Sequence, residues 1–218
     1  MRHINAIVYD SGTGGMFLGC KLSGSKDYEL TLSNEYVSTS HSDWVYSKGD
    51  PTINTRNGIT TTHPHELYSF KRKVKKENAT ATTIGITFDP DDTSAKTYAA
   101  ILFEIKHRIH SSIESPVGKD WLDNLVESIK YNWRTFMNNT DIINLGGGVK
   151  ETSYDKTIDF RKLYIDTDIQ EIVKLITYTQ STVDSEWMKQ EIITYTNDNM
   201  KLIDKWAPEF KGYVTNDN

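Results

Sequence analysis

An apolar run, a glycine-rich turn and a second apolar segment follow one another at the N-terminus, and this order most constrains the fold. Residues Ile4–Tyr9 form a compact run rich in β-branched side chains, which is typical of a buried strand. The turn Asp10–Gly15 contains three glycines, and Met16–Leu22 can then begin a helix. Backbone N–H groups of such a turn can point into one concavity, where the helix N-terminus adds partial positive charge. The pattern predicts either a site for a phosphate or sulfate group or a tight structural turn.

The candidate anion-binding residues belong to the turn itself: Ser11, Gly12, Thr13, Gly14 and Gly15. The turn is not a complete nucleotide-triphosphate loop, because that loop requires a lysine directly after its last glycine. Met16 and Phe17 stand there instead. An anion bound here would therefore be held by backbone amides.

Strand and helix patterns alternate along the rest of the chain. Strands are predicted over Gly58–Thr62, Ala81–Phe88 and Thr157–Ile165. Helices are predicted over Asp92–His110, Lys119–Asn138 and Ser185–Trp206, and over a segment that Thr167 or Asp168 caps and that ends at Thr177. We therefore predict an α/β fold with a P-loop-like parallel sheet flanked by helices and a mostly helical C-terminal half. One domain should cover residues 1–218, with an irregular insertion at 23–58 and a candidate helical cap at 111–156.

Composition and charge argue against several classes of protein. The 218 residues carry a net charge of −5, so we expect no non-specific nucleic-acid binding through global charge. The run Lys71–Lys76 is either a solvated helix face or a local anion-attracting patch. The single cysteine, Cys20, excludes an internal disulfide and a paired zinc site. No stretch approaches the roughly 20 apolar residues that span a bilayer, and the N-terminus does not resemble a signal peptide. We expect a cytoplasmic protein with no membrane partner.

A histidine follows the second predicted strand. His63 stands directly after Thr61-Thr62 and before Pro64, where open α/β sheets place their ligands. Its near-neutral pKa suits the removal of a proton from an acceptor hydroxyl. The other interpretation is a helix-start histidine bonded to the backbone. His63 is the better base candidate because His65 lies further along the chain.

A third polar segment follows the strand Ala81–Phe88. Asp, Thr and Ser side chains within 89–94 are typical of a helix cap. Lys96 and Thr97 could reach a phosphate group above the sheet. The carboxylates of this segment could instead bind a divalent cation, although near-consecutive acids seldom converge on one ion.

Together these segments resemble the sulfotransferases. The strand followed by Ser-Gly-Thr-Gly-Gly-Met-Phe-Leu at 11–18 is similar to the family's 5′-phosphosulfate loop, commonly Lys-Ser-Gly-Thr-Thr-Trp-Leu. Thr62-His63-Pro64 resembles the Thr-His segment that supplies the family's base. The stretch Phe88–Tyr98 is similar to the Arg-Asn-Pro-x-Asp…Ser-Tyr stretch that grips the 3′-phosphate. The similarity covers residues 4–100, and the size and polar style resemble small sulfotransferase-like proteins of bacteriophages.

The resemblance implies a sulfotransferase, which moves a sulfonate from a phosphoadenosine phosphosulfate-like donor to a hydroxyl or amine acceptor. The amides of Ser11–Gly15 and the hydroxyl of Thr13 would hold the 5′-phosphosulfate, and His63 would take the acceptor proton. Lys96, Thr97 and the run Lys71–Lys76 would supply positive charge, and no metal would be required. A phage-encoded protein would act in the host cytoplasm.

Two positions depart from the family's pattern. Asp10 stands where the family has its loop lysine, and Phe88 stands where it has the 3′-phosphate arginine. The later segment Phe160–Lys162 resembles an Arg-Lys element of the family. The matching segments therefore supply only part of the positive charge that the family places around the phosphosulfate donor.

Two alternatives stay open beside the sulfotransferase. One is a degenerate nucleotide or small-molecule kinase, with magnesium at Asp89 or Asp91. The other is a non-catalytic P-loop-like protein that binds a small molecule or nucleotide, or that serves in assembly. The residues leave open which of these applies, and they do not specify an oligomeric state.

Overall fold

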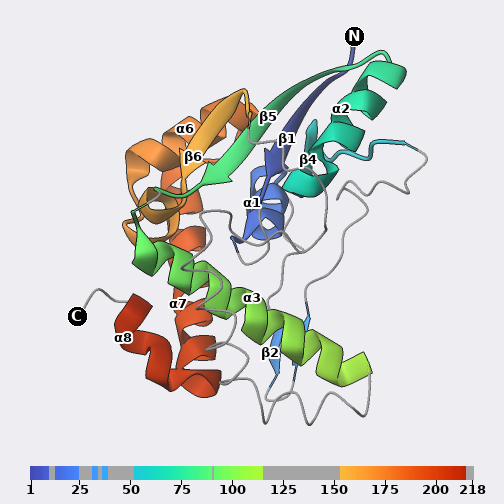
Figure 1. Ribbon diagram of the computed structural model, residues 1–218. Coiled ribbons are helices and arrows are strands. Elements are labelled where there is room, and N and C mark those ends of the chain that lie inside the picture. Colours follow the sequence, from blue (N-terminus) through green and yellow to red (C-terminus); the bar gives the residue numbers. More distant parts are fainter. Residues whose placement is uncertain are drawn as a thin grey trace.

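The computed structural model describes residues 1–9, 13–24, 31–33, 36–38, 52–89, 91–114 and 153–214. Its centre is a four-stranded parallel sheet with the order β4-β1-β5-β6 (Figure 1). The strands are β1 (His3–Val8), β4 (Ile59–Thr62), β5 (Thr80–Thr87) and β6 (Lys156–Asp159). The predicted α/β fold, with a parallel sheet flanked by helices, is confirmed.

The two faces of β1 pack against different helices. Ile4 and Val8 point to one face and are buried against α2 (Leu67–Lys76). Ile7 points to the opposite face and is buried against α1 (Gly15–Leu22) and the C-terminal helices. Both faces of the strand are covered, which explains why Ile4 and Ala6–Val8 are all apolar. The buried Asn5 is the exception, and its side-chain amide donates a hydrogen bond to the carbonyl of Thr179 (2.9 Å).

Helices also make up most of the described C-terminal part. They are α3 (Thr93–Glu114), α6 (Ile169–Thr179), α7 (Ser185–Trp206) and α8 (Lys211–Val214), with the short turns η1 (Pro64–Glu66), η2 (Arg161–Ile165) and η3 (Pro208–Phe210). Figure 1 shows α6 beside β6, and α3 running from the end of β5 toward a separate hairpin of β2 (Thr31–Ser33) and β3 (Tyr36–Ser38). Within the described part of the chain, no helix has both the length and the apolarity needed to cross a bilayer.

Local capping explains where two of these helices begin. The carboxylate of Asp168 accepts a hydrogen bond from the backbone N–H of Gln170, and Asp184 does the same for Trp187. Each side chain satisfies a backbone donor that the first helical turn leaves unpaired. The prediction of a cap at Thr167 or Asp168 is therefore confirmed for Asp168.

One sequence-based prediction in the C-terminal half is wrong in its length. The strand predicted over Thr157–Ile165 ends at Asp159, and a π-helical turn follows. The cause is that Phe160, Leu163 and Tyr164 are buried at spacings of three and one, while Asp159 caps the turn by accepting from the N–H of Lys162. Helix α8 follows η3 and ends at Val214, and an ion pair of 2.8 Å joins Lys211 to Asp204.

Of the other predicted segments, one helix matches the structure closely, and others lie outside the described residues. The helix predicted over Asp92–His110 is α3, which continues to Glu114, so the candidate cap at 111–156 begins inside this helix. The helix predicted over Lys119–Asn138 lies outside the described residues, as does most of the insertion at 23–58. Cys20 is buried in α1.

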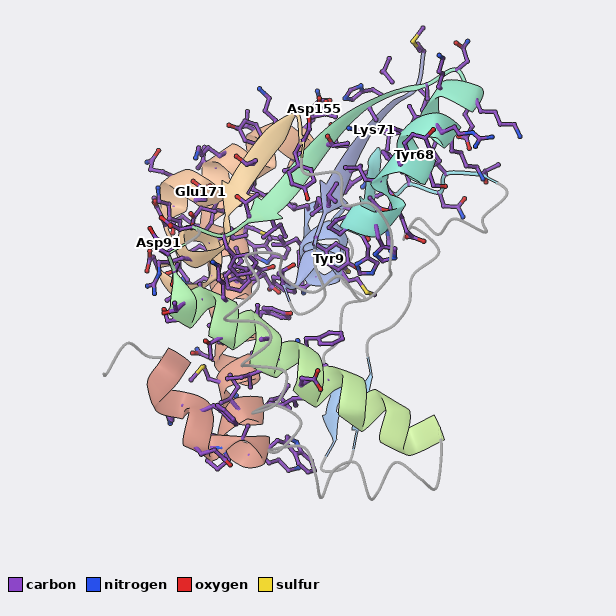
Figure 2. All side chains as sticks on the ribbon, in the orientation of Figure 1. Tyr9, Tyr68, Lys71, Asp91, Asp155 and Glu171 are labelled. Atoms are coloured by element: carbon purple, nitrogen blue, oxygen red, sulfur yellow. The ribbon has the colours of Figure 1, made fainter. Side chains whose placement is uncertain are left out.

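A carboxylate links the start of β6 to the middle of β5. Asp155 lies just before β6 and accepts hydrogen bonds from the backbone N–H of Thr83 (2.8 Å) and from its hydroxyl (2.7 Å) (Figure 2). These bonds, the backbone one first, hold the pKa of Asp155 below its ordinary value, against a smaller opposing effect of burial. The pair fixes the start of β6 against β5.

Replacing Asp155 by asparagine should lower the free energy of unfolding at pH 7 by about 1 kcal/mol, because charge-assisted hydrogen bonds are lost at a partly exposed site. A carboxyl with a lowered folded-state pKa stabilises the fold above its unfolded pKa and loses this effect as the pH falls through the folded value. The difference between wild type and variant should therefore shrink below about pH 4. Urea unfolding at pH 7 and pH 3 measures it, with the exposed Asp91→Asn as the control; an equal difference at both pH values would contradict the assignment.

Candidate functional site

The strand order places a switch point between β1 and β5. From β1 the chain continues to β4 on one side, and it then crosses back over β1 to β5 on the other side. In open parallel sheets, ligands bind outside the carboxyl ends of the strands at such a point. The segments that follow β1, β4, β5 and β6 all begin at this edge. The structure therefore brings the described end of the glycine turn, Thr13–Gly15, together with His63 and Asp91–Ser94 to one edge of the sheet.

The described part of the glycine turn has structural reasons for its glycines. Gly14 has φ of +70°, a left-handed conformation that favours glycine, and it caps α1. A Cβ on Gly15 would lie 2.0 Å from Cγ of Tyr9, so only glycine lets α1 approach the end of β1. Thr13 is buried. The predicted site residues Ser11 and Gly12 lie outside the described residues, together with Asp10.

Two tyrosines from distant segments close around this turn. The hydroxyl of Tyr164, in η2, donates a hydrogen bond to the carbonyl of Gly14 (3.1 Å). The hydroxyl oxygens of Tyr164 and Tyr195 lie 2.5 and 2.9 Å from the place that a Cβ on Gly14 would occupy. Tyr195 comes from α7 and stacks on Phe17 of α1, with ring centroids 4.2 Å apart. Phenol groups therefore line the Gly14 side of the turn.

His63 lies directly after β4, and the end of β1 holds its ring. Its Nδ1 is 3.1 Å from the carbonyl oxygen of Tyr9. Because a carbonyl can only accept, Nδ1 carries the proton, and the lone pair of the neutral ring is on Nε2. The ring also packs against those of Tyr9 and His65, at centroid distances of 4.6 and 5.4 Å.

Burial lowers the pKa of His63 below its ordinary value of 6.5; the backbone bond to Tyr9 opposes this effect, and neighbouring His65 adds to it. His63 is therefore neutral at pH 7, with a basic nitrogen at Nε2. The backbone-bonded histidine of the sequence-based interpretation is observed, and the general base stays a prediction that this bond leaves open.

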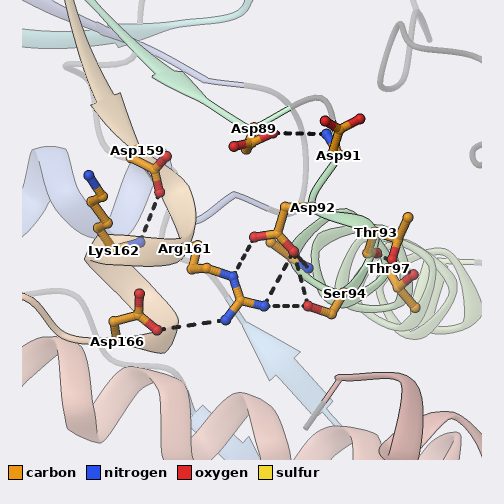
Figure 3. A network of polar contacts seen from close by, with 11 residues as sticks. Asp89, Asp91, Asp92, Thr93, Ser94, Thr97, Asp159, Arg161, Lys162 and Asp166 are labelled. Atoms are coloured by element: carbon orange, nitrogen blue, oxygen red, sulfur yellow. Dashed lines mark hydrogen bonds and ion pairs between the residues drawn. The ribbon is translucent and has the colours of Figure 1, made fainter. Parts of the chain in front are cut away.

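An ion-pair network fixes the start of α3. Asp92 accepts from the backbone N–H of Ala95 and from the hydroxyl of Ser94, each at 3.0 Å. The guanidinium of Arg161 binds both oxygens of Asp92 and also the Ser94 hydroxyl (Figure 3). Burial alone would raise the pKa of Asp92, but the hydrogen bonds from Arg161, Ala95 and Ser94 together hold it below its ordinary value. The network ties the segment after β6 to the segment after β5.

The structure places the other predicted phosphate ligands less favourably. Thr97 is buried, and its hydroxyl donates a hydrogen bond to the carbonyl of Thr93 within α3 (2.7 Å) (Figure 3). The hydroxyl proton is therefore already used inside the helix and is not directed at a phosphate. Lys96 is half-buried on the first turn of α3. Asp89 accepts from the backbone N–H of Asp91, and no three His, Cys, Asp or Glu side chains of the described residues converge as a metal site requires.

The basic run Lys71–Lys76 lies at the wrong end for a ligand at this edge. Helix α2 starts after the carboxyl end of β4 and ends just before Thr80, where β5 begins. Its lysine-rich end is therefore directed to the amino edge of the sheet. In Figure 2, Lys71 lies on the α2 side of the sheet, and its ammonium is 3.4 Å from the carbonyl oxygen of Ser153.

Sequence reasoning missed the residues that reach this edge from the C-terminal half. The sequence singled out Arg161 through its likeness to a late Arg-Lys element of the sulfotransferases. No sequence feature predicted that Arg161 pairs with Asp92. Tyr164 and Tyr195 belong to amphipathic segments in which a buried tyrosine is an ordinary core residue. Nothing in their local sequence points to a turn more than 140 residues earlier.

Comparison with known proteins found no family model, no curated protein and no solved structure that matches this chain. The parallel sheet and the arrangement at its carboxyl edge are therefore the basis for any statement about function.

Proposed function

We propose that the protein binds a phosphosulfate nucleotide over the carboxyl ends of β1 and β5 and transfers its sulfonate to a hydroxyl or amine acceptor. The observation that carries this proposal is the state of His63. Its Nδ1 donates to the carbonyl of Tyr9, the last residue before the glycine turn, so the ring is held next to that turn and its basic nitrogen is Nε2. The donor is of the phosphoadenosine phosphosulfate type.

In the proposed reaction, the N-terminus of α1 and His63, at the carboxyl edge of the sheet, have separate roles. Backbone N–H groups around Thr13–Gly15, at the N-terminus of α1, stabilise negative charge on the sulfonate. The acceptor oxygen or nitrogen attacks sulfur, the bond from sulfur to the phosphate oxygen breaks, and adenosine 3′,5′-bisphosphate leaves. Nε2 of His63 takes the acceptor proton.

A non-catalytic binding or assembly protein is the second candidate, and one observation favours it. The space beside Gly14 is lined by the phenols of Tyr164 and Tyr195, and the space beside Gly15 is filled by the ring of Tyr9. These contacts give the glycines a packing role that requires no ligand. An assembly protein of this kind would bind no nucleotide, whereas a non-catalytic nucleotide-binding protein would bind one without transferring a sulfonate.

Calorimetric titration with adenosine 3′,5′-bisphosphate, beside ATP with magnesium, tests the proposal. We expect the bisphosphate to bind and ATP with magnesium not to bind. Replacing Thr13 by valine, which keeps the shape and removes the hydroxyl, should weaken binding of the bisphosphate by about tenfold, as for one lost hydrogen bond to a charged group.

The matched control for this titration is Thr80→Val, at the amino edge of the sheet, where the hydroxyl contacts His3. It should bind as the wild type does. Binding of neither nucleotide to folded protein would favour the non-catalytic candidate, and binding of ATP only with magnesium would favour a kinase.

A further inference from the structure

The glycine turn of the proposed site contains no basic residue, and the segments that resemble the sulfotransferases contribute one, Lys96 on the first turn of α3. Asp10 and Phe88 occupy the two positions where a lysine and an arginine would be expected. The guanidinium of Arg161 is paired with Asp92, and Asp166 lies 3.7 Å from it. A sulfonate or phosphate at the glycine turn therefore needs positive charge from another part of the chain.

Lys106 of α3 contacts a tyrosine that lies against the turn. Its Nζ is 3.1 Å from the hydroxyl oxygen of Tyr195 and 4.8 Å from the centre of that ring. An ammonium can only donate, so the phenol oxygen accepts from it, and the phenol's own proton is directed away from Lys106. The same oxygen lies 2.9 Å from the place of a Cβ on Gly14.

Tyr195 is held firmly between Lys106 and the turn. The residue is buried, and its ring stacks on Phe17 in the first turns of α1. The stacking couples the position of the phenol to the helix whose N-terminus faces the proposed anion. A hydroxyl that accepts from an ammonium becomes a stronger donor, because hydrogen bonds in a chain polarise one another.

We propose that Lys106, acting through Tyr195, supplies the positive charge for the anion held at the glycine turn. This inference rests on the proposed function and names a cation for the glycine turn in addition to Lys96. Lys106 is a positioning residue, because it acts through the Tyr195 hydroxyl. The opposing explanation is that Lys106 only packs over an aromatic ring, as lysines do at many partly exposed sites.

Titration with adenosine 3′,5′-bisphosphate at low ionic strength separates the two explanations. Lys106→Met removes the charge and keeps the length of the side chain, and it should weaken binding by about tenfold. Lys106→Arg keeps the charge and should bind within about threefold of the wild type. Tyr195→Phe keeps the ring and should weaken binding, and Lys106→Met should add little in that background because the two act in series.

The control for overall charge is Lys76→Met, at the other edge of the sheet, which should leave affinity unchanged. Raising the salt concentration should reduce the difference between Lys106→Met and the wild type, since an electrostatic effect is screened. A merely packing role predicts equal affinity for Lys106→Met and wild type, or losses that salt does not change. Either result overturns the inference.

The outcomes also separate this inference from the proposed function. If the wild type binds the bisphosphate and Thr13→Val weakens it while Lys106→Met does not, the function stands and the role of Lys106 is wrong. If the folded wild type does not bind, both are wrong. Should Lys106→Met fail to fold, the comparison of Lys106→Arg with Lys106→Gln gives the same test.

Discussion

Replacing His63 by asparagine is expected to slow sulfonate transfer by about 10²- to 10⁴-fold, the usual contribution of a general base. The amide N–H₂ of asparagine can still donate to the carbonyl of Tyr9, so the end of β1 keeps its hydrogen bond. The variant has no basic nitrogen to replace Nε2. Binding of adenosine 3′,5′-bisphosphate should therefore stay close to that of the wild type while turnover falls.

The measurement is release of the bisphosphate from a phosphosulfate donor, with phenol, alcohol and amine acceptors in turn. His3→Asn is the matched control, because His3 begins β1 at the opposite edge of the sheet and contacts Thr80 and Thr82. It should retain wild-type turnover. Equal turnover in the wild type and His63→Asn would falsify the assignment of His63 as the base.

The pH dependence of the wild type gives an independent check. Burial lowers the pKa of His63 below 6.5, and only the neutral ring can accept a proton. The rate should therefore be constant near pH 7 and fall only as the pH drops below 6.5. His63→Asn should lose this acid limb, whereas a limb centred above 6.5 would point to a different group.

Replacing Gly15 by alanine is expected to lower the free energy of unfolding by about 3 kcal/mol, at the upper end of the range for overpacking. The added Cβ would lie 2.0 Å from Cγ and 2.5 Å from Cβ of Tyr9. These atoms are close to the backbone of a buried residue, so a change of side-chain torsion cannot remove the overlap. Helix α1 must move away from β1, and the glycine turn must move with it.

Urea unfolding followed by circular dichroism measures this loss, with Gly24→Ala as the control. Gly24 has φ of +72°, but a Cβ there would have 3.9 Å to its nearest neighbour, an atom of Asn57. Its variant should lose about 1 kcal/mol from backbone strain alone. Equal losses in the two variants would show that the contact with Tyr9 is not the cause.

Local sequence patterns determined where several of the elements begin and end. The run Ile4–Tyr9 and the strand predicted over Ala81–Phe88 correspond to β1 and β5 within a residue or two at each end, and Ser185–Trp206 is α7. Those elements are long, apolar on the buried side and closed by glycine, proline or a capping aspartate. Such signals act within a few residues, so they can be read without knowledge of the fold.

The sequence also determined that a glycine turn and a histidine follow two strands, and a parallel sheet then brings them to one edge. Only the tertiary structure decided the chemistry around them. The tautomer of His63 depends on a carbonyl 54 residues away, and the Gly14 side of the turn is lined by phenols at positions 164 and 195. Arg161 is paired with a carboxylate 69 residues earlier, and Lys106 contacts a phenol 89 residues later. The physical reason is that packing between distant segments, and no local propensity, chooses such partners.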